Sequence, residues 1–104
     1  MLASTFHQLI TFTDRPRFPL GQIVATPAAL QALGEAGETA APYLARHQAG
    51  DWGDLDEEDR RENEYGVARR LRLLSSYPLP TGTKLWVITE ADRSATTLLL
   101  PDDY

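Results

Sequence analysis

The sequence predicts an α+β domain, because the spacing of its hydrophobic residues changes once along the chain. Up to about Arg72 they recur as in helices, and glycine- or proline-containing stretches separate three such segments. From Leu73 onward apolar and polar residues alternate, as in strands. A short apolar strand precedes the helices. The expected order is therefore β-α-α-α-β-β-β, with three helices packed on a sheet made of a three-stranded antiparallel meander plus the N-terminal strand. The length of 104 residues suits a single domain, 1–104.

The first half of the chain is predicted to contain one strand and two helices. Residues 1–20 are a candidate extended N-terminal arm, because two prolines interrupt the stretch DRPRFP. GQIVAT (21–26) follows as a short strand. Thr26 and Pro27 are typical of a helix start, since threonine caps free N–H groups and proline has none. A second helix is expected over APYLARHQA (41–49), with the next glycine ending it.

The third helix has the strongest N-terminal signal. Asp54 is the expected N-cap, and Glu57 follows three residues later in an aspartate version of the capping box. The run of acidic residues after Asp54 suits the positive end of the helix dipole. Tyr65, Ala68 and Leu71 are expected to form the buried stripe of this helix.

Three strands are predicted in the last third of the chain, over LLSSY (73–77), KLWVITE (84–90) and SATTLLL (94–100). Both faces of the middle strand carry apolar residues, which favours a central position in the sheet. A tight turn at ADR joins the last two strands.

Composition and charge exclude several classes of function. The chain has no cysteine, which excludes disulfides and cysteine-ligated zinc. No apolar run is long enough to span a membrane, and the N-terminus lacks a signal-peptide pattern, so we expect a cytoplasmic protein without membrane contact. The formal net charge of −5 argues against nucleic acid as a partner, because binding to phosphates depends on Lys and Arg.

The segment HQAGDWGDLDEEDRREN (47–63) is the first candidate site. His47, Asp51 and Asp54 offer one imidazole and two carboxylates, a ligand set that a divalent metal such as Mn²⁺ or Mg²⁺ could use. The alternative is architecture, with an Asx-type turn at Asp51 and a helix cap at Asp54. Trp52 lies between two glycines. It is either a plug over the core, which is the more frequent case, or an exposed stacking surface.

The hairpin ITEADRSATT (88–97) is the second candidate site. Glu90, Asp92 and Arg93 at its tip could bind phosphate or carry out acid–base chemistry. The alternative is an exposed loop with a local ion pair.

Two functions are compatible with these features. In the first, the chain is non-catalytic and binds a protein partner through its acidic helix and the turn at Trp52. Its binding residues would be Trp52, Asp54, Glu57, Glu58, Glu90 and Asp92. In the second, the chain is a small metal-assisted hydrolase or nuclease. Its catalytic residues would be His47, Asp51 and Arg93, and its metal ligands His47, Asp51 and Asp54. Apart from such a metal, no cofactor is expected. A homodimer is compatible with the unassigned N-terminal arm and edge strands.

Three stretches resemble a family of short, uncharacterised bacterial proteins: FPLGQIVATPAAL, RHQAGDWGDLDEEDRRENE and KLWVITEADRSATTLLLPDDY. Members of this family occur on plasmids and integrative mobile elements and are labelled plasmid-related proteins. Some are mislabelled as the M subunit of a type I restriction enzyme, although 104 residues without a cofactor-binding glycine loop do not suit a methyltransferase. The resemblance covers roughly residues 18–104. It implies an accessory role in a mobile element and supplies no catalytic residues.

Overall fold

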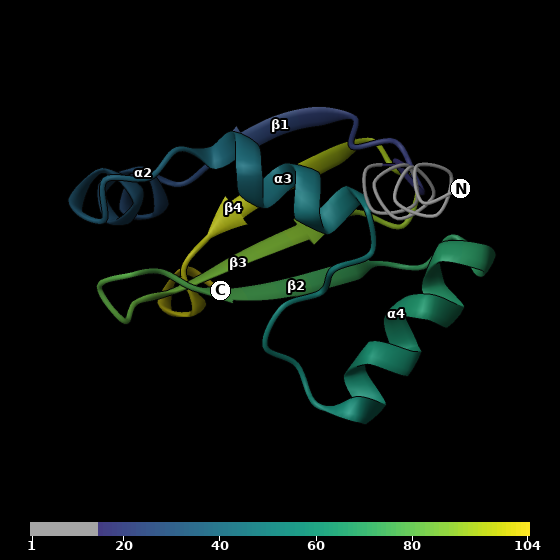
Figure 1. The fold of residues 1–104 in the computed structure, drawn as a ribbon. Helices are drawn as coiled ribbons and strands as arrows, with labels where there is room; N and C mark the ends of the chain where they lie inside the picture. Colours follow the sequence, from purple (N-terminus) through teal and green to yellow (C-terminus); the bar gives the residue numbers. More distant parts are fainter. Residues whose placement is uncertain (1–14) are drawn as a thin grey trace, which may run out of the picture.

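A computed structural model describes residues 15–104 and has the expected α+β class (Figure 1). Residues 1–14, the larger part of the candidate N-terminal arm, lie outside the described part. The elements are β1 (Gln22–Ala25), α2 (Pro27–Glu35), α3 (Ala40–Gln48), α4 (Glu57–Arg69), β2 (Leu73–Pro78), β3 (Lys84–Thr89), β4 (Ala95–Leu99) and the 3-10 turn η1 (Pro101–Asp103). Within residues 15–104, no helix has the length and apolar character needed to cross a membrane.

The four strands form one mixed sheet in the order β1-β4-β3-β2. Strands β2, β3 and β4 are antiparallel neighbours, and β3 has a strand on each side, as its two apolar faces predicted. The sheet nevertheless differs from an antiparallel meander, because β1 joins it parallel to β4. This arrangement places β1 and β2, which follow each other among the strands of the chain, at opposite edges of the sheet, and the three helices supply the long connection between them.

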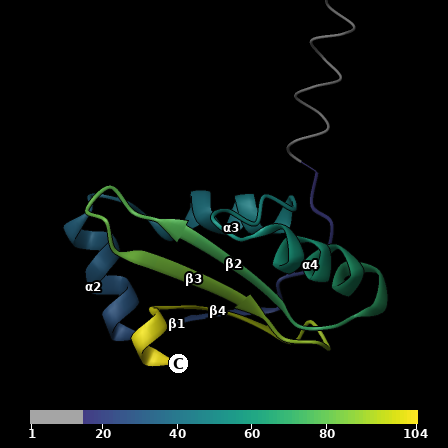
Figure 2. The same ribbon diagram turned by 90° about the horizontal axis from the view of Figure 1, so that it is seen from below.

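Helices α2 and α3 cover one face of the sheet, whereas α4 lies alongside β2 (Figures 1 and 2). The main core lies under α2 and α3, where Tyr43 packs on Tyr77 with ring centroids 5.5 Å apart. The predicted start of α2 is confirmed: Pro27 is its first residue, and the Thr26 hydroxyl accepts the N–H of Ala29 at 3.0 Å.

Helix α4 begins two residues later than the sequence indicated. The N-cap is Asp56, whose carboxylate accepts the N–H of Asp59 at 2.8 Å, so the assignment of the cap to Asp54 was wrong. The N–H of Asp54 instead donates to the carbonyl of Ser76 in β2 at 2.7 Å. This pairing keeps the chain extended beside β2, and the helix can start only after it.

The buried side of α4 also differs from the predicted stripe. Tyr65 and Leu71 are 56% and 46% exposed, whereas Asn63 and Gly66 are buried. The Asn63 amide accepts the N–H of Leu74 at 3.1 Å and donates to its carbonyl at 2.7 Å. A single polar side chain therefore replaces a neighbouring strand at this edge of β2.

Candidate functional site

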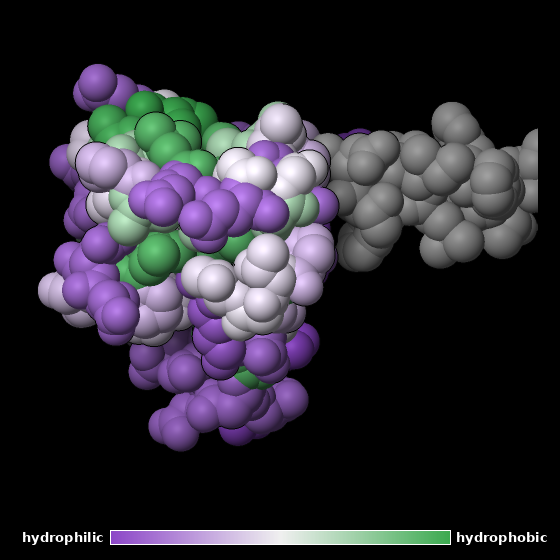
Figure 3. Space-filling model, turned by 90° about the vertical axis from the view of Figure 1, so that its left-hand side faces the viewer, coloured by the Kyte–Doolittle hydropathy of each residue, from purple (hydrophilic) through white to green (hydrophobic). Residues whose placement is uncertain are grey.

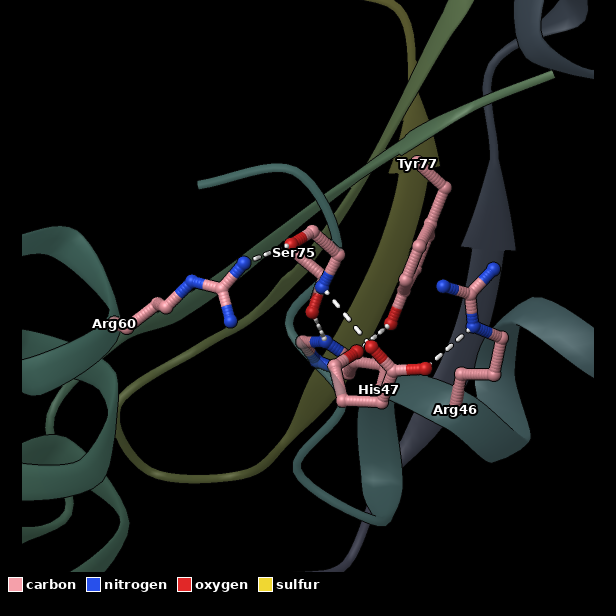
Figure 4. A network of polar contacts seen from close by, with 7 residues as sticks. Arg46, His47, Arg60, Ser75 and Tyr77 are labelled. Atoms are coloured by element: carbon pink, nitrogen blue, oxygen red, sulfur yellow. Dashed lines mark hydrogen bonds and ion pairs between the residues drawn. The ribbon is translucent and has the colours of Figure 1, made fainter. Parts of the chain in front are cut away.

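His47 is completely buried, and both of its ring nitrogens have partners. Nδ1 lies 2.6 Å from the Ser75 hydroxyl, and Nε2 lies 2.9 Å from the Thr89 hydroxyl. Figure 4 shows the contact between His47 and Ser75. The hydroxyls of Thr89 and Thr96 are 2.7 Å apart, and that of Thr96 donates to the carbonyl of Leu20 at 2.7 Å. These contacts form one continuous chain of hydrogen bonds through the core.

The donor-to-acceptor direction of these hydrogen bonds assigns the His47 tautomer. Because Thr96 uses its proton on a carbonyl, it accepts from Thr89, and Thr89 in turn accepts from Nε2–H of His47. Nδ1 then accepts the proton of Ser75. Burial, and secondly the positive charge of Arg93, lower the pKa of His47 to about 3. The ring is therefore neutral at physiological pH, and its lone pair is engaged by a hydroxyl.

Asp51 forms the Asx-type turn that was one of its two predicted roles. Its carboxylate accepts the N–H of Gly53 at 3.2 Å and Nε of Arg46 at 2.7 Å, and its carbonyl accepts the Tyr77 hydroxyl at 2.6 Å. Figure 4 shows Arg46 and Tyr77 reaching this turn from α3 and β2. Gly53 has φ +78°, and a Cβ there would lie 2.1 Å from the carbonyl oxygen of Ser76, so the turn requires glycine.

The three expected metal ligands do not converge. His47 faces hydroxyls, Asp51 is bound within its own turn, and Asp54 is exposed with its carboxylate 3.8 Å from Nζ of Lys84. Among residues 15–104, no group of three or more His, Cys, Asp or Glu side chains is placed to hold a metal ion.

Trp52 is buried in the interior, which agrees with the first of its two predicted roles, a plug over the core. It is 4% exposed, its ring stacks on Phe18 with centroids 6.2 Å apart, and its Nε1–H donates to Glu64 at 2.9 Å. Glu64 also accepts both terminal nitrogens of Arg17, at 2.8 and 2.9 Å. The turn at Trp52 therefore does not present an aromatic surface to a partner.

Arg93 is likewise structural. Its guanidinium donates to the carbonyls of Gly66 and Leu71, at 2.9 and 2.7 Å, and joins the β3–β4 turn to the end of α4. With 6% of its surface exposed and both terminal nitrogens bonded to backbone carbonyls, its guanidinium offers little surface to a phosphate. Glu90 and Asp92 remain exposed at the turn, where the Asp92 carboxylate accepts the N–H of Ser94 at 3.0 Å.

The side chains that do converge are apolar and line a groove of about 590 Å³ beside α4. Trp86 and Ile88 in its lining alternate along β3 with Leu85 and Val87 of the main core. The groove therefore lies against the face of the sheet that α2 and α3 leave open. Its apolar lining consists of Leu55, Tyr65, Leu71, Leu73, Leu74, Trp86, Ile88 and Tyr104. Within this lining, the ring of Tyr104 meets that of Trp86 edge-on, with the centroids 5.8 Å apart.

The wall of the groove formed by α4 is mainly acidic. It contains Glu58, Asp59 and Glu62, with Arg61 among them. Arg72 also lines the groove, with its guanidinium over the ring of Tyr104. Of the six residues that the sequence predicted to bind a partner, only Glu58 lines the groove. Glu57 is exposed on the same turn of α4.

Sequence reasoning missed the groove because Tyr65 and Leu71 had been assigned to the core. The available signal was KLWVITE, where Trp86 and Ile88 make the second face of a strand apolar. Comparisons with protein-family models, with curated proteins and with solved structures found no match, so the geometry of the groove is the main support for a function.

Proposed function

We propose that the chain is a non-catalytic accessory protein that binds a protein partner in the groove beside α4. The observation that carries this proposal is the gathering of exposed apolar residues. Six large apolar side chains are exposed among residues 15–104, and three of them line this groove: Tyr65, Leu71 and Tyr104. Exposed apolar side chains that gather in a groove with a charged rim are typical of an interaction site.

The acidic wall defines the chemistry of the partner. Apolar side chains would enter the groove, and lysine or arginine residues next to them would face Glu58, Asp59 and Glu62. An amphipathic segment with basic residues beside its apolar face meets both requirements. The proposal keeps the acidic helix as the binding element and replaces the turn at Trp52 with the groove.

The setting proposed for this interaction is the cytoplasm, with a partner encoded by a mobile element or by its host. The support is the resemblance to short proteins of plasmids and integrative elements, together with the lack of cysteine. The metal-assisted alternative receives no comparable support, because His47, Asp51 and Arg93 are each engaged in contacts that hold the fold together.

Capture from a host lysate with matched variants tests the groove. Leu71→Glu places a charge in the groove, and Leu30→Glu places the same charge at an exposed leucine of α2. We expect a specific partner to be retained by the wild type and by Leu30→Glu and to be lost with Leu71→Glu. Equal capture by all three proteins would contradict the proposal.

The two tryptophans supply an internal control once a partner has been isolated. Trp86 lines the groove, whereas Trp52 is buried against Phe18. In a chain labelled with fluorotryptophan, we expect binding to shift the ¹⁹F resonance of Trp86 and to leave that of Trp52 in place. A shift confined to Trp52 would argue for a site elsewhere.

A further inference from the structure

A second group of exposed apolar side chains lies outside the groove. Ile23 and Val24 in β1 are 44% and 40% exposed, and Leu30 in α2 is 57% exposed. Figure 3 shows hydrophobic surface gathered at the upper left of the molecule, on the side where β1 and α2 lie in Figure 1, and mainly hydrophilic surface at the lower end, the side of α4. None of these three residues lines the groove, so they form a separate candidate surface for a partner.

We propose that β1 pairs in antiparallel orientation with β1 of a second copy of the chain, across a two-fold axis. The two four-stranded sheets would then form one continuous sheet. The proposal is independent of the partner in the groove.

The outer edge of β1 has backbone groups available for this pairing. The N–H of Gln22 donates to Ser94 and that of Thr26 to Leu98, at 2.9 and 3.0 Å, so alternate residues of β1 face β4. The N–H and C=O groups of Ile23 and Ala25 therefore point away from the sheet. Proline, lysine and bulges, which often protect an edge strand, are absent from Gln22–Ala25.

The opposite edge of the sheet is closed to another strand. At β2, the Asn63 amide engages both backbone groups of Leu74. Two residues on, Ser76 donates its N–H to Trp52 at 3.1 Å and accepts the N–H of Asp54. Among the described residues, β1 is therefore the edge at which strand addition can occur.

Charge favours a second copy as the occupant of this edge. Residues 18–34 contain no Asp, Glu, Lys or Arg, although 24% of the chain is charged. Two copies that each carry a net charge of −5 repel each other, and pairing along a segment without charged side chains keeps like charges out of the strand-to-strand contact. The cores of protein interfaces are depleted of charge in the same way. The groove has an acidic wall and suits a basic partner instead.

The outward-facing N–H and C=O groups of Ile23 and Ala25 define the register of the proposed pairing between the two β1 strands. Ile23 of each copy would lie opposite Ala25 of the other, so that both exchange N–H and C=O hydrogen bonds. Val24 would then lie on the two-fold axis and face Val24 of the second copy. Because Val24 faces β4 with its own backbone groups, this central pair is of the non-hydrogen-bonded type, in which the side chains are closest.

The register can be tested directly, since the chain has no cysteine and a single substitution supplies its only thiol. In the proposed dimer the two Val24 Cα atoms would lie roughly 4.5 Å apart, within the range that a disulfide spans. We expect mild oxidation of Val24→Cys to give a covalent dimer on a non-reducing gel. Ile23→Cys is the matched control, because Ile23 is similarly exposed but lies opposite Ala25 of the other copy. Its thiol would have no thiol partner across the axis, so we expect this variant to run mainly as a monomer on the same gel. Equal cross-linking of both variants would overturn the register.

The mass in solution tests the dimer itself. We expect light scattering to give the wild type twice the chain mass of 11.6 kDa and Val24→Lys a single chain mass, because two lysines would meet on the axis. Leu71→Lys adds the same charge in the groove and should remain dimeric. A monomeric wild type, or a Val24→Lys variant that is folded and still dimeric, would overturn the proposal. Dissociation by Leu71→Lys alone would assign self-association to the groove, which would overturn this proposal and weaken that of a separate partner there.

Discussion

His47 shows how one buried polar residue can be fully accommodated by its neighbours. Each hydrogen bond in the chain from Ser75 to Leu20 has one donor and one acceptor only when the imidazole is neutral and carries its proton on Nε2. A second proton on Nδ1 would meet the proton that Ser75 already donates. Protonation would therefore break this chain, in addition to burying a charge close to Arg93.

The depressed pKa of His47 makes the fold sensitive to acid. Between an ordinary value of 6.5 and the folded value of about 3, the unfolded chain binds a proton at His47 that the folded chain does not. This contribution to the free energy of unfolding is fully present above pH 6.5 and decreases below it by about 1.4 kcal/mol per pH unit. Urea unfolding of the wild type and of His47→Gln across this range should show a steeper loss in the wild type.

NMR of the wild type provides a test that does not depend on the folding of a variant. We expect the ¹⁵N shifts of His47 to identify the neutral Nε2–H tautomer and to stay constant well below pH 6.5. Titration of this residue near pH 6.5 would contradict the hydrogen-bond assignment.

At the scale of elements, α4 buries few apolar side chains, and polar contacts at its two ends hold it in position. Arg60 donates to the carbonyls of Gly53 and Leu55, both at 3.0 Å, which ties the first turn to the preceding segment; Figure 4 includes Arg60 in this network. Arg93 holds the carbonyl of Gly66 near the other end. These polar contacts hold the helix beside β2, and they leave Tyr65 exposed toward the groove.

The position of the N-cap can be tested with two aspartates that differ by two residues. Asp56→Ala removes the acceptor for the N–H of Asp59 and should lower the free energy of unfolding by about 1 kcal/mol. Asp54→Ala leaves the backbone bond to Ser76 in place and removes an exposed ion pair, so its effect should stay below about 0.5 kcal/mol. Chemical denaturation measures both, and a larger cost at Asp54 would contradict the assigned cap.

At the scale of the whole molecule, a second aromatic cluster joins segments that are distant in sequence. The Phe18 ring meets His47 edge-on at 5.2 Å, stacks on Trp52 and lies 5.6 Å from the guanidinium of Arg93. Arg17 extends the same connection to Glu64 of α4. Residues 17 and 18 therefore link α3, α4 and the β3–β4 turn.

Removing this link should destabilise the whole fold. Phe18→Ala empties a site enclosed by three other elements, and we expect it to cost about 3–5 kcal/mol of the free energy of unfolding. Leu30→Ala removes an exposed side chain and should cost much less. Thermal unfolding followed by tryptophan fluorescence compares the two variants. Similar midpoints would show that Phe18 is not a structural link.

Local rules were sufficient for much of this chain. The change in hydrophobic spacing at Leu73 predicted the order of the elements, and Thr26 with Pro27 predicted the start of α2. The Asx-type turn at Asp51 was one of the two interpretations offered by the sequence, and it forms. Each of these features depends on residues that are close together along the chain, where steric limits and single hydrogen bonds decide the conformation.

The candidate site depended on contacts that span the chain. His47 binds hydroxyls 28 and 42 positions away, so its ligand-like chemistry gave no indication that both nitrogens are engaged. Asp54 and Asp56 have similar capping patterns, and the pairing of Asp54 with Ser76 chose between them.

The sequence by itself determined the class of the fold and the order of its elements, because periodicity and capping are local properties. Tertiary structure decided that β1 lies beside β4, that Trp52 is buried and that Tyr65 and Leu71 face a groove. The physical reason is that strand pairing and the side on which a helix packs are set by the joint burial of segments far apart in the chain. An apolar residue in the sequence has the same character whether its eventual neighbour is the core of its own chain or a binding partner.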